Sequence, residues 1–153
     1  MIRVRALRAP LGVAAAVAIA GCGAAPTSAV HETAAPPSSA PPAETLHPLF
    51  QRALPNAQGM TFTSAIVTFP PGARALPHRH GDAFVYAYVL EGAVSSELEG
   101  EPAHVYRQGE NWSEAPRAHH LVTENTSATA PAKLLVVFVA PSGSPLKVDD
   151  PPN

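Results

Sequence analysis

The stretch Gly72-Ala-Arg-Ala-Leu-Pro-His78-Arg-His80 carries two histidines separated by a single residue. Alternate side chains of a β-strand point to the same face, so this spacing aims both imidazoles at one point. A second pair, His119-His120, follows further along the chain. Neutral imidazole is a ligand for zinc, copper, iron and nickel, and two ligands from one strand with a third from a distant strand form an open metal site. The sequence therefore predicts a metal centre around His78 and His80.

Short β-rich runs bounded by turn residues surround these histidines. No helical period extends beyond about two turns. The short runs recur at a regular spacing along the chain, which predicts an all-β sandwich or barrel. Turn chemistry comes from stretches such as Pro70-Pro71-Gly72 and Glu91-Gly92. Residues 46–54 fit either a short helical turn or an edge strand. The expected strands are 60–69, 84–90, 94–99, 103–107, a short piece near Trp112, 119–124 and 133–140.

The expected strand 84–90 is apolar on both faces. Period two places Phe84, Tyr86, Tyr88 and Leu90 on one side and Val85, Ala87 and Val89 on the other. A strand with one solvated face alternates with polar residues, so the outer face is predicted to be covered by a second layer or another subunit. We expect the aromatic side to form a homodimer contact.

At the level of motifs the chain resembles the cupin superfamily, whose members are small jelly-roll barrels built as a double-stranded β-helix. The first cupin motif, G-x5-H-x-H-x3,4-E-x6-G, is matched by Gly72, His78, His80 and Gly92, with Val85 at the glutamate position. The resemblance extends from about Ala65 to Ala140.

The second cupin motif, G-x5-P-x-G-x2-H-x3-N, is matched by Gly109 and His120. Ala115 and Arg117 replace its proline and glycine, although Pro116 can serve the same turn. Asn125 lies one residue later than the motif expects. Adjacent strand residues face opposite ways, so the register favours His120 over His119 as the inward residue, and His119 is expected on the outer face or rim.

In cupins, two histidines and the glutamate of the first motif bind one divalent metal together with the histidine of the second. The resemblance thus implies His78, His80 and His120 as metal ligands, without a carboxylate because Val85 cannot coordinate. Loss of a negative ligand lowers the expected affinity. The remaining three-histidine site is predicted to hold a divalent transition metal, with iron, zinc, manganese, nickel and copper all open. The alternative is a barrel whose histidines form hydrogen bonds and hold no metal.

Other polar residues have weaker claims to this site. Asp82 follows His80 closely and could replace the missing carboxylate, but its position in a turn already explains it. Trp112 fits the mouth of a cavity or the core equally well. Arg74 and Arg117 flank the two motifs and could recognise an anion, although a solvated rim is the simpler interpretation. No second acid–base group stands at a recognisable position, so the catalytic residues are unknown.

The N-terminal residues resemble a bacterial lipoprotein signal. Arg3, Arg5 and Arg8 precede an apolar run, 11–20, that is too short to span a bilayer, and Ile19-Ala-Gly-Cys22 resembles a lipobox. The resemblance implies cleavage before Cys22 and lipidation of that cysteine, which would anchor the protein to a membrane outside the cytoplasm, on the periplasmic side or at the cell surface. An ordinary secretory signal is the alternative. Cys22 is the only cysteine, so no intramolecular disulfide can form.

The resulting organisation is a signal peptide over 1–21, a disordered Ala/Pro/Ser linker over 22–45, a barrel domain over 46–141 and a flexible tail over 142–153. A formal charge of −2 with no basic cluster in the domain argues against a nucleic-acid partner. We expect a divalent metal, a small-molecule ligand or both inside the barrel. A metal-dependent enzyme acting on a small organic substrate, a non-catalytic binding protein and a structural dimeric barrel all remain open.

Overall fold

The protein is described by a computed structural model that covers residues 42–151. The signal peptide, Cys22 and most of the expected linker lie outside the described residues. From residue 42 to residue 151 the chain forms ten strands and no helix, and therefore no helix that could cross a membrane.

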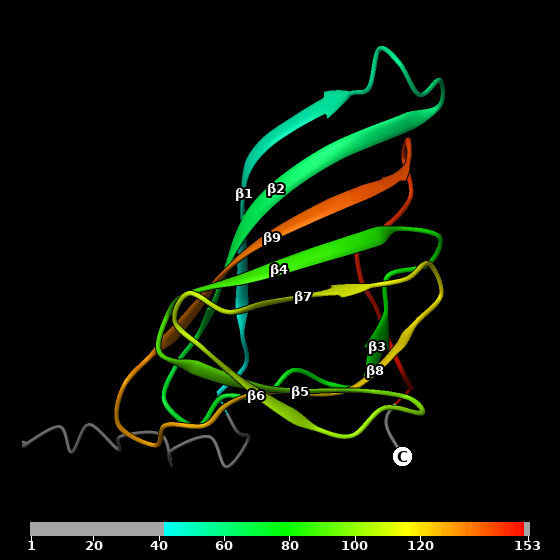
Figure 1. The fold of residues 1–153 in the computed structure, drawn as a ribbon. Helices are drawn as coiled ribbons and strands as arrows, with labels where there is room; N and C mark the ends of the chain where they lie inside the picture. The colour runs from blue at the N-terminus through cyan, green and yellow to red at the C-terminus, as the bar shows by residue number, and fades with distance from the viewer. Residues whose placement is uncertain (1–41, 152–153) are drawn as a thin grey trace, which may run out of the picture. The chain divides into compact units, whose positions relative to one another are not determined.

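The strands form two five-stranded antiparallel sheets, which Figure 1 shows as two layers. Sheet A contains, in order, β1 (Thr45–Ala53), β2 (Met60–Phe69), β9 (Ala132–Pro141), β4 (Phe84–Glu91) and β7 (Asn111–Glu114). Sheet B contains, in order, β10 (Val148–Asp149), β3 (His78–Arg79), β8 (His119–Asn125), β5 (Ala93–Leu98) and β6 (His104–Arg107). The predicted all-β jelly roll is confirmed.

The core lies between the inner faces of the two sheets. Burial alternates strictly along β9 and along most of β2 and β4, as period two requires. Phe69 and Phe138 are each 1% exposed and fill the space against Val85 and Val89. Burying one such side chain contributes about 1.5–3 kcal/mol to the free energy of folding. The inner face of sheet A is therefore a stable apolar surface that faces sheet B.

The outer face of β4 carries the aromatic side chains, as the sequence predicts. Val85, Ala87 and Val89 are buried, whereas Tyr86 and Tyr88 are half-buried on the opposite face. Phe84 and Leu90 are exposed on the same outer face. The homodimer contact expected there stays a prediction.

Both ends of the domain are strands. Of the two alternatives for residues 46–54, the edge strand is observed, because β1 pairs with β2 from Thr45↔Thr68 to Ala53↔Thr61. The C-terminal end differs from the expected flexible tail, since β10 pairs with β3 through Val148↔Arg79 and Asp149↔His78. Backbone groups of the short β3 strand need partners on both sides, and β10 supplies those that β8 does not.

Candidate metal centre

The three predicted histidines meet at one point inside the barrel. His78 in β3 lies directly opposite His120 in β8, and His80 follows one residue after the end of β3. One ligand atom from each residue lies within 4.8 Å of the others. The ring centroid of His78 lies 4.8 Å from that of His80 and 5.1 Å from that of His120. Spacing on a strand and the second motif together therefore predicted this cluster.

Backbone carbonyls orient the first two rings. The Nδ1 of His78 lies 2.7 Å from the carbonyl oxygen of Leu76, and the Nδ1 of His80 lies 2.5 Å from that of Leu146. A carbonyl only accepts hydrogen bonds, so each Nδ1 must carry the proton. The Nε2 atoms then present their lone pairs, which is the arrangement of metal-binding histidines whose other nitrogen is held by an outer partner.

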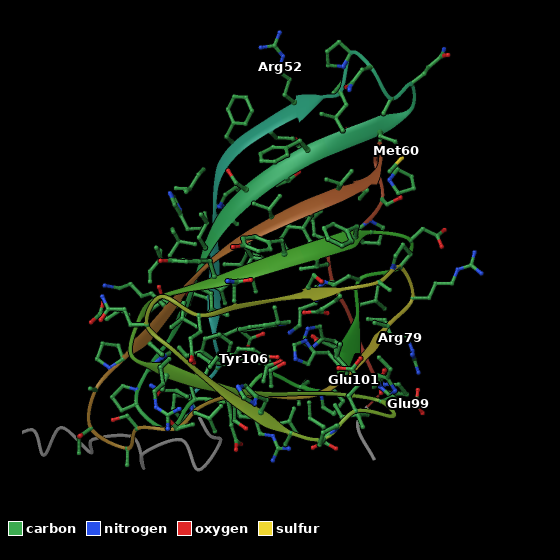
Figure 2. All side chains as sticks on the ribbon, in the orientation of Figure 1. Arg52, Met60, Arg79, Glu99, Glu101 and Tyr106 are labelled. Atoms are coloured by element: carbon green, nitrogen blue, oxygen red, sulfur yellow. The ribbon has the colours of Figure 1, made fainter. Side chains whose placement is uncertain are left out.

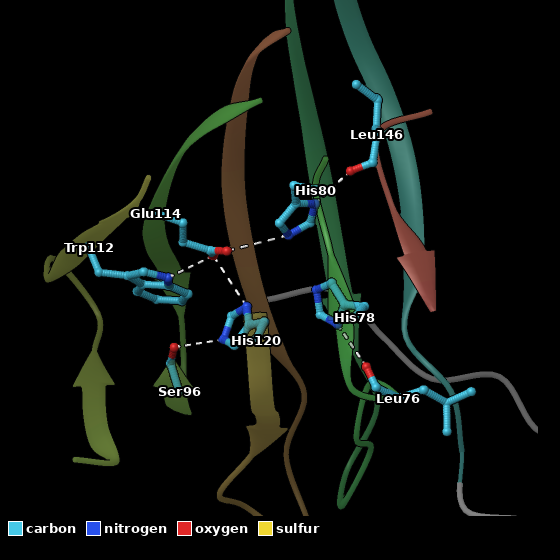
Figure 3. Close-up of polar contacts among 8 residues, drawn as sticks. All are labelled: Leu76, His78, His80, Ser96, Trp112, Glu114, His120 and Leu146. Carbon is cyan, nitrogen blue, oxygen red and sulfur yellow. Dashed lines mark hydrogen bonds and ion pairs between the residues drawn. The ribbon is translucent and has the colours of Figure 1, made fainter. Parts of the chain in front are cut away.

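A buried carboxylate that no sequence motif predicts completes the cluster. Glu114 is at the end of β7, and its side chain is only 3% exposed. Its Oε1 accepts a hydrogen bond from Trp112 Nε1 at 3.1 Å and lies 3.2 Å from His120 Nδ1. Its Oε2 lies 3.6 Å from His80 Nε2. Figure 3 shows these contacts converging between the sheets.

Glu114 corrects the expectation that the site lacks a carboxylate, and it is an acid–base group at a position that the motifs do not mark. The residue is the cross-strand partner of Val85, which occupies the motif's glutamate position. The signal that could have revealed it is the alternation along β7, where Trp112 and Glu114 are buried and their neighbours exposed. An inward-facing tryptophan two residues earlier predicts an inward-facing carboxylate.

Ser96 positions the third histidine. The hydroxyl of this β5 residue lies 2.8 Å from His120 Nε2. When that nitrogen donates to Ser96, His120 Nδ1 presents its lone pair toward Glu114. When Ser96 donates instead, Nδ1 carries the proton and faces Glu114 Oε1, so in either tautomer a proton or a cation lies between these two atoms, which are 3.2 Å apart.

The residues present fit a transition metal. Glu114 Oε2 and His120 Nδ1 are buried and have no hydrogen-bond partner. A buried unpaired polar group costs about 1–3 kcal/mol, so two at the same place indicate a ligand that satisfies both. Three imidazole nitrogens and one carboxylate oxygen form a donor set that suits zinc, iron, copper and nickel. This set does not select one of these metals.

Burial keeps two of the histidines in the neutral form that coordinates metals. Burial lowers the pKa of His78 to about 4, aided by the charges of His80, His120 and Lys147 and opposed by the bond to Leu76. Burial likewise lowers the pKa of His80, although the Glu114 carboxylate opposes the shift. Both imidazoles are therefore neutral at neutral pH, which is the form that binds metals.

Glu114 is held in its ionised form. Burial alone would raise the pKa of its carboxyl, but His120 at 3.2 Å, with His80 and the Trp112 N–H, lowers it further than burial raises it. A negative ligand among neutral imidazoles favours a dication.

The cluster lines a cavity of about 70 Å³ between the two sheets. Ligand pockets commonly measure about 300–1,000 Å³, so this one admits a metal ion with a small molecule but no large substrate. Trp112 is packed in the core, as one of its two interpretations predicts, and it also lines the cavity. The remaining lining residues are mainly apolar side chains of sheet A, with Glu44, Thr123 and Lys147 as further polar members.

The other three weaker candidates, Asp82, Arg117 and Arg74, do not line the cavity. Asp82 pairs with Arg117 at 2.7 Å, and both side chains are exposed. Arg117 adopts a φ of 70°, which explains why the cupin motif has glycine at this position. Arg74 lies 3.7 Å from Glu124 on the surface.

His119 faces outward, as predicted. Its Nε2 lies 2.7 Å from Asp150 Oδ2, and its Nδ1 lies 3.5 Å from the exposed Glu99 carboxylate. Figure 2 shows Glu99 and Arg79 pointing away from the barrel on this side. His119 is therefore separated from the inward His120 by strand parity alone.

The fold and the site define a double-sheet jelly roll with a histidine cluster and a carboxylate in its interior. Residues 65–138 match the family model described as the cupin domain. This match and the two-sheet fold together support a cupin domain over these residues. A search of curated protein sequences found no match.

Solved structures share this fold. Oxalate oxidase in complex with the substrate analogue glycolate is 24% identical over 76% of this chain and 60% of that chain, with a TM-score of 0.55. The protein TT1209 from Thermus thermophilus is 28% identical over 64% of this chain and 83% of that chain, with a TM-score of 0.51. The DMSP lyase DddQ from Ruegeria pomeroyi is 20% identical over 57% of this chain and only 42% of its own length, with a TM-score of 0.51.

Proposed function

We propose that the barrel binds one divalent transition metal through His78, His80, His120 and Glu114, and that the loaded site acts on a small organic molecule. The observation that carries this proposal is the convergence of three imidazoles and a buried carboxylate, with two unpaired polar atoms, in one cavity. A bound metal would supply Lewis-acid or redox chemistry. The same fold occurs in an oxalate oxidase and a DMSP lyase, so it is an architecture that can accommodate an enzyme site.

Glu114 gives the site a group that can move a proton. Trp112 holds Oε1, whereas Oε2 has no hydrogen-bond partner and faces His80. A carboxylate fixed at one oxygen and free at the other can coordinate a cation or accept a proton from a substrate beside it. The apolar walls from Phe69, Val85 and Phe138 lower the local dielectric and so strengthen these electrostatic contacts.

A non-catalytic binding protein is the second candidate. The observation that favours it is the size of the cavity, which is small for an organic substrate. A third interpretation, a structural barrel without metal, is compatible with the hydrogen bonds that hold one nitrogen of each histidine.

Metal content separates these interpretations. Protein purified without a histidine tag should carry stoichiometric metal, and a His78→Ala/His80→Ala variant should lose it. His104→Ala is the matched control, because His104 is exposed on β6. Equal, substoichiometric metal in all three proteins would rule out the metal centre. Stoichiometric redox-active metal would favour an oxidising enzyme, whereas bound zinc without turnover of small metabolites would favour the binding protein.

We further propose that the mature protein is exported and attached to a membrane through lipid on Cys22. This proposal rests on the basic start, the short apolar run and the lipobox-like Ile19-Ala-Gly-Cys22.

A further inference from the structure

One lysine reaches the cavity that holds the histidine cluster. Within residues 42–151, Lys147 is the only lysine or arginine that lines this cavity. Its side chain is 26% exposed, so it lies between the interior and the solvent. The preceding residue, Leu146, accepts the hydrogen bond from His80 Nδ1 and fixes this segment against the cluster. The lysine is therefore held beside the site by the same backbone that orients one of its histidines.

The ammonium of Lys147 already forms ion pairs with carboxylates of the chain. Lys147 Nζ lies 2.5 Å from Glu44 Oε1 and 2.7 Å from Asp149 Oδ1. Glu44 also lines the cavity and is 16% exposed, whereas Asp149 is 45% exposed and does not line it. The Glu44 carboxylate, which lines the cavity, shows that the space beside the Lys147 ammonium can accommodate a carboxylate.

We propose that Lys147 binds the carboxylate of a short organic acid whose other end faces the histidine cluster, and that Glu44 occupies this position until the acid displaces it. This inference rests on the proposed metal site and names its substrate class. An ammonium and a metal that line one cavity would hold a small acid in one orientation.

Two further observations agree with a small acid. The cavity of about 70 Å³ has room for only a few non-hydrogen atoms. Thr123 Oγ1 also lines the cavity, is buried and has no hydrogen-bond partner, so it offers a second polar contact to a bound molecule.

The competing interpretation is a clamp that joins the two ends of the domain. Glu44 precedes β1 and Lys147 precedes β10, so their ion pair links the N-terminal and C-terminal segments. The two interpretations differ for Glu44→Gln. A clamp would be weakened by this substitution without any gain in binding, whereas an anion site would become more available.

The test measures binding by calorimetry or NMR titration, with acetate, glycolate and malonate as probes and acetamide as the neutral isostere of acetate. Wild-type protein should bind the acids and not acetamide. Lys147→Gln should weaken acid binding about tenfold or more, which is the effect of losing one hydrogen bond to a charged group. Glu44→Gln should strengthen it. Lys133→Gln is the control and should leave it unchanged, because Lys133 pairs with Glu91 away from the cavity.

Each titration is run on metal-loaded and on EDTA-treated protein, with metal content measured in the same samples. Unchanged acid affinity in Lys147→Gln would overturn the inference, as would a Glu44→Gln variant that unfolds more easily and binds acids no better. Absence of metal from every sample would instead refute the proposed metal site, and the EDTA-treated titrations would still decide the role of Lys147. No binding of any acid to wild-type protein in either state would also overturn the inference.

Discussion

Val85 and Glu114 are directly opposite one another across the β4–β7 pair, and both side chains line the cavity. Cβ atoms of directly opposed residues are about 4.5–5.5 Å apart, so a carboxylate on either strand can reach the same point. The glutamate of the cupin motif is thus absent from β4, and its charge is supplied by the neighbouring strand. The site thus still combines three histidines and one carboxylate, but the carboxylate comes from β7 instead of β4.

The role of Glu114 as the replacement carboxylate can be tested by returning a glutamate to position 85. Glu114→Gln should lower metal affinity by at least about 100-fold, because loss of outer-shell partners alone commonly costs about 10–100-fold. The double variant Val85→Glu/Glu114→Val should bind metal within about tenfold of wild type, since opposed positions share the same reach. Metal competition with a chromophoric chelator measures both. A double variant that binds no better than Glu114→Gln would show that the two positions are not equivalent.

We expect Ser96 to affect metal affinity only through its contact with His120. Ser96→Ala removes the partner of His120 Nε2, so the ring loses its fixed orientation and metal affinity should fall about 10–100-fold. Thr123→Val is a suitable control, because Thr123 is buried in the same cavity and its hydroxyl makes no hydrogen bond. The same chelator competition applies. If both variants bind metal like wild type, the Ser96 contact does not orient a ligand.

The sequence predicted the sheets better than the site. The expected strand 60–69 coincides with β2, and the parity of 84–90 is that of β4, because long apolar strands carry a clear period of two. The strands β3 and β10 have two residues each, which is too short for any period to show. The segment that contains β10 lies in a proline-containing stretch that resembles a tail.

The candidate site was predicted as far as its ligands follow one motif. His78 and His80 share a strand, and His120 follows from the second motif. Glu114 was missed because the contact that brings it to the site is a cross-strand pairing between β4 and β7, and register between strands is not written in either strand alone. Lys147 was missed for the same reason, since only the pairing of β10 with β3 carries it to the cavity.

Membrane attachment depends on Cys22 in this proposal. Cys22→Ser, expressed in a bacterium with lipoprotein processing, should move the protein from the membrane fraction to the soluble fraction, because several acyl chains anchor a protein far more firmly than the barrel alone. Fractionation with immunoblotting measures this. Unchanged membrane association of the variant would argue against lipidation, and a cytoplasmic wild-type protein would argue against export.

We propose that the outer face of sheet A forms the contact of a homodimer. Tyr86 and Tyr88 lie on this face beside Val137 and Leu135 of β9, and Lys133 is neutralised by Glu91. The four apolar side chains form a strip with no unpaired charge beside it, so two copies can face each other there without burying a lone charge. Tyr86→Lys/Tyr88→Lys should therefore halve the mass measured by light scattering. A variant that keeps the wild-type mass would rule out this contact.

Acid should destabilise the metal-free domain in a defined range. His78 has a pKa of about 4 in the folded protein against an ordinary value of 6.5, so between these values the unfolded chain binds more protons than the folded one. Stability therefore rises with pH in this window and is lost as pH falls from 6.5 toward 4. The full difference corresponds to about 3 kcal/mol, and the lowered pKa of His80 adds to it in the same direction. Urea unfolding in EDTA at several pH values measures the slope, which should be smaller in His78→Gln and unchanged in the exposed His104→Gln. Equal slopes in His78→Gln and wild type would show that burial of this imidazole does not set the acid sensitivity.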